Sequence, residues 1–526
     1  MSFSKHTESN TERNAEGKHA EEAEEYDVIV VGGGPAGATV SAAVAMRGHR
    51  VLLVEQHRFP RYQIGESLLP STVHGVCRIL GVEDEVARAG FKLKRGGTFR
   101  WGRNRDPWQF SFALSPRLAD PTSFAYQVER SRFDAILLDN ARRVGVDVRE
   151  GCRVTTVLAD EERVRGVTWT GPNGGTRKAR ARYVVDASGN GSRIHTHVGG
   201  KRTYSDFFRN IAVFGYFAGG QRLPAPNDGN IFCAAFDEGW IWYIPLRDDL
   251  TSVGAVVSRE NAAAIQRDPA AAWRRLIDSC PEVRGLLDGV PQATEAPYDQ
   301  VRVRRDWSYW KSRLWRPGMV LTGDAACFVD PVLSSGVHLA TYGALLAARS
   351  INTVLAGTAG TAGTAGTAGT LDEDHCFDEF EARYRHEYAL FYEFLVSFYD
   401  MHQDERSYFW KARKVTNVGA TELEAFVELV GGLASGDASL TAPSQAGTRL
   451  TAASSALDQA VGRLPDSDGL RNPLFESPNI RQVFQEGTIL QERGLFGGPL
   501  EDEAPLSPGG LVATEDGLAW ADPGAR

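Results

Sequence analysis

The strongest constraint on the fold lies near the N-terminus, where a glycine-rich turn connects an apolar segment to a run of small residues. Residues 26–31 read YDVIVV and residues 32–37 read GGGPAG. This pattern is typical of a strand, a turn and a helix that bind a dinucleotide, with Gly32, Gly34 and Gly37 spaced as G-x-G-x-x-G. The first glycine permits the turn, the second admits a pyrophosphate, and the third lets helix pack on strand. The predicted phosphate-binding residues are Gly32, Gly34, Pro35, Ala36 and Gly37.

Three further apolar segments end in residues that suit the same ligand. Residues 50–54 read RVLLV and precede Glu55, which is placed to accept the ribose hydroxyls of an adenosine. Residues 182–189 read RYVVDASG, and residues 320–326 read VLTGDAA. Each segment is predicted to be a strand that ends at a turn. An acidic residue at position 55 favours an unphosphorylated ribose.

In this order, the segments resemble the flavoprotein monooxygenase superfamily. The resemblance implies that the dinucleotide is FAD and that the aspartate of the GDAA turn binds its ribityl chain. It also implies that Arg132 lies near the flavin. The further residues that the resemblance assigns to FAD are Glu55, Arg61, Ser67, Arg132, Val154, Asp186, Gly323, Asp324, Pro331, Gly336 and Val337.

A long helix is predicted to follow the GDAA turn and to point its N-terminus at the flavin. Residues 330–336 read DPVLSSG, and the helix is expected to run from Val337 to about Leu355, with Gly357 as its stop. The helix dipole would stabilise negative charge on the reduced flavin or on a bound anion. The amides of Ser335 and Gly336 are candidates for binding chloride, although an ordinary helix cap would have the same sequence.

The segment at residues 240–245 reads WIWYIP and helps to indicate which reaction the flavin serves. In a strand, Trp240 and Trp242 lie on one face, so taken alone they could be core residues. Within the superfamily, Trp240, Trp242, Ile244 and Pro245 resemble the W-x-W-x-I-P motif of flavin-dependent halogenases. Residues 65–70 (GESLLP) and 91–102 (FKLKRGGTFRWG) support this resemblance. It covers about residues 26–415 and is closest to phenol halogenases that chlorinate tyrosyl or β-tyrosyl groups on a peptidyl carrier protein.

The family's chemistry assigns a role to one lysine. Reduced FAD (FADH2) and O2 form a flavin hydroperoxide, chloride attacks it, and a lysine holds or carries the resulting hypochlorous acid. The matching residue is Lys94, because it directly precedes the RGG segment, whereas Lys92 is the competing surface lysine. The tryptophan pair would separate flavin from substrate. No catalytic base is assigned: His74, His338 and Glu66 are more simply read as satisfied buried groups.

Composition limits the partners of the chain. The formal net charge of −9 and a pI of about 5.8 argue against nucleic acid as a partner. A carrier protein would need a local basic patch, and a separate flavin reductase is also expected. The six cysteines lack metal-binding spacing, and no apolar run is long enough for a membrane span, so we expect a cytoplasmic protein without metal. The candidate patches are Arg302, Arg304 and Arg305, or Lys411, Arg413 and Lys414.

The predicted fold class is α/β, with an FAD-binding doubly wound domain, an antiparallel substrate-binding sheet and a mainly helical C-terminal region. The FAD domain is expected to comprise residues 26–199 with 316–355, and the substrate sheet residues 200–315. The remaining predicted parts are a disordered leader (1–25), a Gly-Thr-Ala linker (356–370), a helical region (371–496) that includes an aromatic helix at 377–399, and a disordered tail (497–526).

Two other functions fit parts of the sequence. A single-component FAD hydroxylase of the same fold would reduce its own flavin with NAD(P)H, and it differs from a halogenase in the tryptophan motif and Lys94. A non-catalytic flavoprotein could use the FAD as part of an interaction module, but Lys94, Ser335 and Gly336 would then have no purpose.

Overall fold

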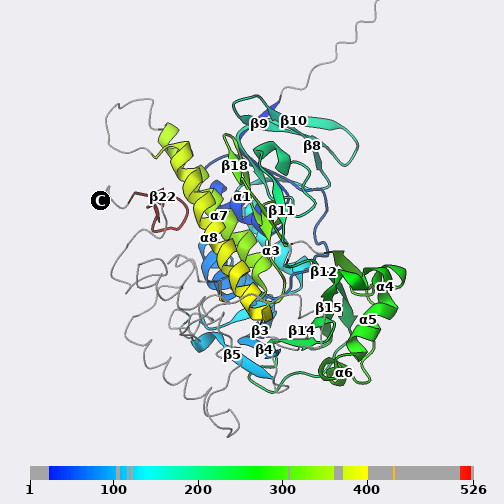
Figure 1. Cartoon of the computed structure of the whole chain (residues 1–526). Helices are drawn as coiled ribbons and strands as arrows, with labels where there is room; N and C mark the ends of the chain where they lie inside the picture. The colour runs from blue at the N-terminus through cyan, green and yellow to red at the C-terminus, as the bar shows by residue number, and fades with distance from the viewer. Residues whose placement is uncertain are drawn as a thin grey trace, which may run out of the picture.

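The computed structural model describes residues 23–101, 107–114, 118, 122–205, 207–305, 308–359, 371–400, 431–432 and 510–522. Figure 1 shows a mixed α/β arrangement with two large sheets and a pair of long helices. The predicted fold class is confirmed, including the doubly wound FAD-binding part. The structured chain begins slightly earlier than expected, because Glu24 and Glu25 already belong to the first strand.

The first sheet carries the dinucleotide fingerprint. Its central strands pair in parallel, and the inner half of β1 is fully buried. Helix α1 (Pro35–Ala45) consists of small, buried residues, so it can pack closely between this sheet and helices α3 (Arg130–Arg143) and α7 (Ser335–Ala359). The strand order is β18 (Trp315–Arg316), β19 (Met319–Leu321), β10 (Thr176–Asp186), β1 (Glu24–Val31), β2 (Val51–Val54) and β7 (Asp147–Arg149), with β9 (Val164–Thr170) pairing β10 and β8 (Arg153–Ala159) pairing β9.

The second sheet is the one that the sequence analysis expects to bind substrate. Its outer face packs on the short helices α4 (Ala262–Arg267), α5 (Pro269–Asp278) and α6 (Pro281–Leu286), where Trp273 is fully buried (Figure 1). Its other face turns toward the FAD-binding part. The order is β16 (Arg302–Arg305), β12 (Asn210–Phe217), β15 (Leu250–Ser258), β14 (Gly239–Arg247), β13 (Ile231–Phe236), β4 (Gly96–Arg100) and β5 (Trp108–Ser111).

Two predictions about this sheet are corrected. Strands β4 and β5 come from the segment that we assigned to the FAD domain, yet they extend the substrate sheet. The sheet is also not purely antiparallel, because β13 pairs in parallel with β4. The remaining elements are β3 (Lys92–Lys94) with β6 (Ala125–Gln127), β11 (Arg202–Tyr204) with β17 (Tyr309–Lys311) and β20 (Cys327–Phe328), helix α2 (Glu83–Arg88) and a π-helix (Ser71–Cys77).

Helices α7 and α8 (Glu373–Asp400) pack side by side across the molecule (Figure 1). Helix α7 extends through Gly357 to Ala359, so the predicted stop at Gly357 is wrong and the start of the expected linker is helical. The aromatic helix predicted at residues 377–399 is confirmed as α8. The rest of the predicted linker and most of residues 401–496 lie outside the described residues.

Part of the predicted disordered tail is instead a packed element. Residues 510–522 form a small hairpin of β21 (Val512–Ala513) and β22 (Trp520–Ala521) against α7 and α8. The Trp520 indole is buried, donates a hydrogen bond to Ser350 Oγ at 2.9 Å, and lies beside the guanidinium groups of Arg349 and Arg383. Low apolar content over the whole tail hid these few anchoring residues.

All six cysteines are buried and free. In the part of the chain that the structure describes, no group of His, Cys, Asp and Glu residues is arranged to hold a metal ion. The described helices likewise include none with the length and apolar character needed to cross a membrane.

Candidate active site

A cavity of about 1040 Å³ runs between the two large sheets. At one end it is lined by the glycine turn after β1, where a side chain at position 37 would place its Cβ 1.8 Å from the Gly32 carbonyl oxygen. Gly32 also has a φ of +105°, which only glycine adopts readily. The turn therefore presents bare backbone to the cavity at the positive end of α1.

Polar groups surround this end of the cavity. The buried Glu55 carboxylate accepts hydrogen bonds from the backbone N–H groups of Gly33 (2.6 Å) and His57 (2.7 Å), which fix its position at the cavity wall. Arg61 reaches the same wall and is held by Asp134 at 3.0 Å. An acceptor and a cation therefore lie where an adenosine ribose and a pyrophosphate would need them.

The resemblance implied that Arg132 lies near the flavin. In the structure, the arginine beside the cavity is Arg130 instead. Arg130 is buried, lines the cavity, and is held by Asp134 and by the Ile64 carbonyl. Arg132 points away from the cavity: it bonds Glu129 and is about half exposed. A buried Arg–Asp pair at i and i+4 of α3 is the signal that distinguishes the two.

The tryptophans of β14 line the opposite end of the cavity. Trp240 and Trp242 share one face of the strand, as predicted, and their ring centroids are 6.0 Å apart. Gly254 on β15 leaves room for this arrangement, since a Cβ there would lie 2.2 Å from the Trp242 ring. Phe214, Ile231, Ile244 and Val256 complete an apolar wall.

Lys94 lies just behind the cavity wall. Its ammonium group donates to the Leu68 carbonyl at 2.9 Å and lies 3.5 Å from the hydroxyl oxygen of Ser334, which does line the cavity. Phe112 faces the same ammonium group at 5.5 Å. Burial lowers the pKa of Lys94 to about 7, so a substantial fraction of neutral amine is present near neutral pH. Lys92, in contrast, forms ion pairs with acidic residues nearer the surface.

The loop before α7 completes this end of the site. Ser334 adopts a φ of +63°, which is rare for a residue with a side chain and is typical of functional loops. The Ser335 hydroxyl oxygen is buried and has no hydrogen-bond partner within the described structure, and Gly336 lines the cavity. Asp330, also in this loop, accepts a bond from Tyr399 of α8, whose hydroxyl in turn accepts from the Trp240 indole at 2.6 Å.

The structure therefore gathers most of the predicted residues around one cavity. Asp186 is buried and accepts hydrogen bonds from Ser188 and Ser192, and Gly37, Ser335 and Pro245 are buried without lining the cavity. Of the groups considered as bases, His74 bonds Glu83 and His338 bonds Glu387, whereas Glu66 reaches the cavity. The predicted residues that line the cavity directly are Gly32, Gly34, Pro35, Ala36, Glu55, Arg61, Ser67, Val154, Gly323, Asp324, Pro331, Gly336, Val337, Trp240, Trp242 and Ile244.

Sequence reasoning missed two features of the site. Ser334 was not distinguished from Ser335, because only its backbone conformation reveals its position between cavity and lysine. The contact of Tyr399 with Trp240 joins residues far apart in the chain, and no local pattern indicates it.

These residues fit FAD. The glycine turn would be filled by any side chain, and the buried Ser67 hydroxyl lines the cavity without a partner among the described residues, as expected of a group that binds a ligand. Burial also raises the pKa of Asp324 to about 6, and a ribityl hydroxyl that donates to the carboxylate would favour its charged form.

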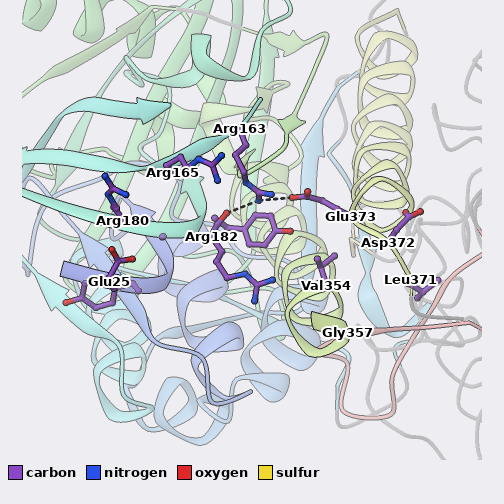
Figure 2. Close-up of a pocket in the computed structure, with 13 residues that line it drawn as sticks. Glu25, Arg163, Arg165, Arg180, Arg182, Val354, Gly357, Leu371, Asp372 and Glu373 are labelled. Carbon is purple, nitrogen blue, oxygen red and sulfur yellow. Dashed lines mark hydrogen bonds and ion pairs between the residues drawn. The ribbon is translucent and has the colours of Figure 1, made fainter. Parts of the chain in front are cut away.

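A second depression, of about 670 Å³, lies near the start of β1 and is rich in arginine (Figure 2). It also contains carboxylates: Arg163 pairs with Glu373 at 3.3 Å, and one of the dashed lines in Figure 2 marks this pair. Glu25 and Asp372 further offset the positive charge. It shares none of the glycine-turn or tryptophan residues, so the cavity between the sheets remains the candidate active site.

The fold and cavity together define an FAD-dependent enzyme of the monooxygenase type, in which the glycine turn and an apolar wall line one cavity. The chain belongs to the tryptophan halogenase family, whose model matches residues 27–120 and 114–443. It is therefore a flavin-dependent halogenase, an enzyme that uses reduced FAD, O2 and a halide.

Individual relatives agree with this assignment. The chain is 33% identical over 393 residues to the tryptophan 2-halogenase of Chondromyces crocatus, covering 74% of this chain and 71% of the relative. It is 48% identical to the myxobacterial chondrochloren halogenase CndH, with a TM-score of 0.73, over 95% of this chain and all of that one. The flavin-dependent halogenase CmlS is 31% identical, with a TM-score of 0.67, over 84% and 78% of the two chains.

Proposed function

We propose that this enzyme chlorinates a phenolic substrate of the tyrosyl or β-tyrosyl type, held on a peptidyl carrier protein, in natural-product biosynthesis in the cytoplasm. The observation that carries the proposal is the contact between Ser334, at the end of the flavin cavity, and Lys94 behind it. The similarity to a chondrochloren halogenase supports the choice of substrate class.

The proposed reaction needs an oxidant, a halide site and a group that holds the oxidised halide. When bound, reduced FAD supplies the electrons that let O2 oxidise chloride to hypochlorous acid. The amides of Ser335 and Gly336 would bind the chloride at the start of α7, where the helix dipole favours an anion. Lys94 would then hold the hypochlorous acid or carry its chlorine to the substrate.

The tryptophans have a different task. Trp240 and Trp242 form a rigid apolar surface in the cavity, and Tyr399 fixes the orientation of Trp240. Such a surface would keep substrate away from the flavin and so suppress direct oxygen transfer, which would give a hydroxylated product.

A phenolic substrate suits the apolar wall. The hydroxyl of a phenol already activates its ortho carbons, and its free pKa is roughly 10, so no strong base is needed. The nearby carboxylate of Asp330, in the loop before α7, is not needed as a base. It accepts hydrogen bonds from the Val332 amide and the Tyr399 hydroxyl. Arg304 of β16 lines the cavity and is exposed, and with Arg302 and Arg305 of the same strand it would provide a local basic patch for an acidic carrier protein.

The test of this function combines the protein, FADH2 regenerated by a separate reductase, chloride and O2 with tyrosine or β-tyrosine, free and carrier-bound. Product mass reports the addition of chlorine. A product that gains oxygen instead would identify a hydroxylase, and the absence of any product under all conditions would favour a non-catalytic flavoprotein.

We expect the protein to depend on a partner reductase. The only dinucleotide fingerprint that we find in the sequence, at residues 32–55, is used for FAD. Mixing the purified FAD-bound protein anaerobically with NADH or NADPH should therefore leave the flavin absorbance unchanged over many turnover times. Adding a flavin reductase should bleach it. Rapid bleaching by the protein alone would contradict this prediction and favour the hydroxylase.

We also expect a preference for tethered substrate. A tyrosyl or β-tyrosyl thioester on a carrier protein should be chlorinated at least ~10-fold faster than the free amino acid, which corresponds to about 1.4 kcal/mol of additional transition-state binding. Single-turnover rates with both substrates measure this ratio. Equal rates would remove the carrier from the proposal and leave halogenation intact.

A further inference from the structure

A line of hydrogen-bonded side chains connects two residues that line the cavity, the partly exposed Tyr62 and the buried Glu66. The Tyr216 hydroxyl donates to Glu66 Oε1 at 2.7 Å, and the hydroxyl oxygens of Tyr62 and Tyr216 are 2.6 Å apart. Glu66 and Tyr216 are buried, whereas Tyr62 is partly exposed, with the guanidinium of Arg302 3.9 Å from its ring centroid. The loop at residues 62–66 is thus joined to β12 by hydrogen bonds and to β16 by the contact with Arg302.

The hydrogens in this line have a defined direction. A phenol has a single O–H donor, and Tyr216 uses it toward Glu66. Tyr62 must therefore donate to Tyr216, so both hydrogens point toward Glu66. The second carboxylate oxygen of Glu66, Oε2, is buried and has no hydrogen-bond partner among the described residues, although Glu66 lines the cavity. A buried oxygen of this kind can carry the proton that the carboxyl group passes on.

We propose that Glu66 delivers a proton to the flavin cavity and that Tyr216 and Tyr62 resupply it from solvent. Halogenation requires protons: converting anionic reduced flavin, O2 and chloride to oxidised flavin, hypochlorous acid and water consumes two, and the competing release of hydrogen peroxide consumes one. Glu66 loses its proton from Oε2, accepts another on Oε1 from Tyr216, and Tyr216 is replenished by Tyr62, which takes its proton from water. The net change is one proton moved from water to the cavity.

The surroundings of Glu66 bring the pKa of its carboxyl group close to neutral pH. Burial raises the pKa of Glu66 to about 7, and the nearby Glu129 acts in the same direction. The hydroxyls of Ser252 and Tyr216 and the positive charge of Arg130 oppose the increase. Around Tyr62, burial and Glu66 raise the pKa of the phenol, while Arg302 and Arg304 oppose this.

The first experiment needs no flavin. Infrared difference spectra of the FAD-free protein should show a protonated carboxyl band that disappears as the pH rises through about 7. The band should be missing in Glu66→Gln. In Tyr216→Phe it should persist to higher pH, because the lost hydrogen bond stabilised the charged form. A wild-type spectrum without such a band would overturn the proposal.

The second experiment follows oxidation of bound reduced FAD by O2 in stopped flow, in H2O and D2O. The wild-type rate should be constant at low pH and fall above about 7 as Glu66 loses its proton. Glu66→Gln should be about 10²-fold slower and lose this pH dependence. Tyr62→Phe leaves the Tyr216–Glu66 bond in place, so it should slow the reaction by a smaller factor and enlarge the solvent isotope effect.

A matched control lies on the other side of Tyr216. The ring of Tyr298 contacts that of Tyr216 at 4.7 Å, but its hydroxyl donates to Glu129 and lies outside the line to Glu66. Tyr298→Phe should keep the wild-type pH profile and isotope effect. If Tyr62→Phe behaves like Tyr298→Phe, the tyrosines have only a structural role and the relay is refuted, even if Glu66→Gln fails to bind FAD.

Discussion

Replacing Lys94 with alanine is expected to reduce chlorination by about 10²-fold or more, the scale of loss when one buried group that stabilises a reacting species is removed. FAD binding and the oxidation of reduced FAD by O2 should be unchanged, because the Lys94 amine lies behind the cavity wall and contacts Leu68 and Ser334. Chlorinated product is measured by mass spectrometry and FAD binding by fluorescence quenching.

The control for this variant is Lys92→Ala. Lys92 lies on the same short strand but pairs with Asp228 and Asp248, so its removal should leave chlorination near the wild-type rate. Chlorination by Lys94→Ala at the wild-type rate would exclude this lysine from the reaction. A loss of FAD binding as large as the loss of chlorination would instead assign it a structural role.

The lowered pKa of Lys94 adds a pH dependence to this expectation. Carrying chlorine requires the neutral amine, and its fraction grows as the pH rises through about 7. The yield of chlorinated product per flavin oxidised should therefore increase over this range. Measuring yield rather than rate separates this effect from changes in flavin oxidation.

Replacing Trp520 with alanine is expected to lower the free energy of unfolding by about 3–5 kcal/mol. The indole is buried between α7 and α8, donates to Ser350, and faces two arginines, so its removal leaves both a cavity and unsatisfied polar groups. Urea unfolding followed by circular dichroism measures the change.

Trp520→Phe serves as the matched variant. It retains an aromatic ring but loses the indole N–H, so it should cost only about 1–2 kcal/mol. If Trp520→Ala were as stable as the wild type, the segment at residues 510–522 would contribute nothing to the fold.

Much of the FAD site could be predicted from local sequence, whereas less of the substrate side could. The glycine turn, Glu55 and the GDAA turn each follow directly from strand to turn, so neighbouring residues determine their geometry. Lys94 and the tryptophans could be identified from the sequence because each lies in a short, contiguous motif. The sheet that unites them could not be delimited, because β4 joins β13 across more than a hundred residues and no pattern in either strand specifies the partner.

Other features depended on details that patterns do not contain. Arg130 and Arg132 are two residues apart, and only packing of α3 decides which one is buried. The position of Ser334 follows from a single backbone dihedral angle. The segment at residues 510–522 was obscured because its few apolar residues are surrounded by glycine, proline and acidic residues, although Leu518 and Trp520 are buried in the structure.

The anchoring of residues 510–522 affects when, relative to translation, the helices they contact can finish packing. Arg349 of α7 donates to the Gly517 carbonyl, Asn352 to that of Leu518, and Arg47, just after α1, pairs with Asp516. Helices formed early in translation therefore acquire some of their buried partners only when this late segment has left the ribosome. Until then, Arg349 lacks its bond to Gly517 and Asn352 its bond to Leu518, so the packing of α7 is completed only after residues 510–522 have been synthesised.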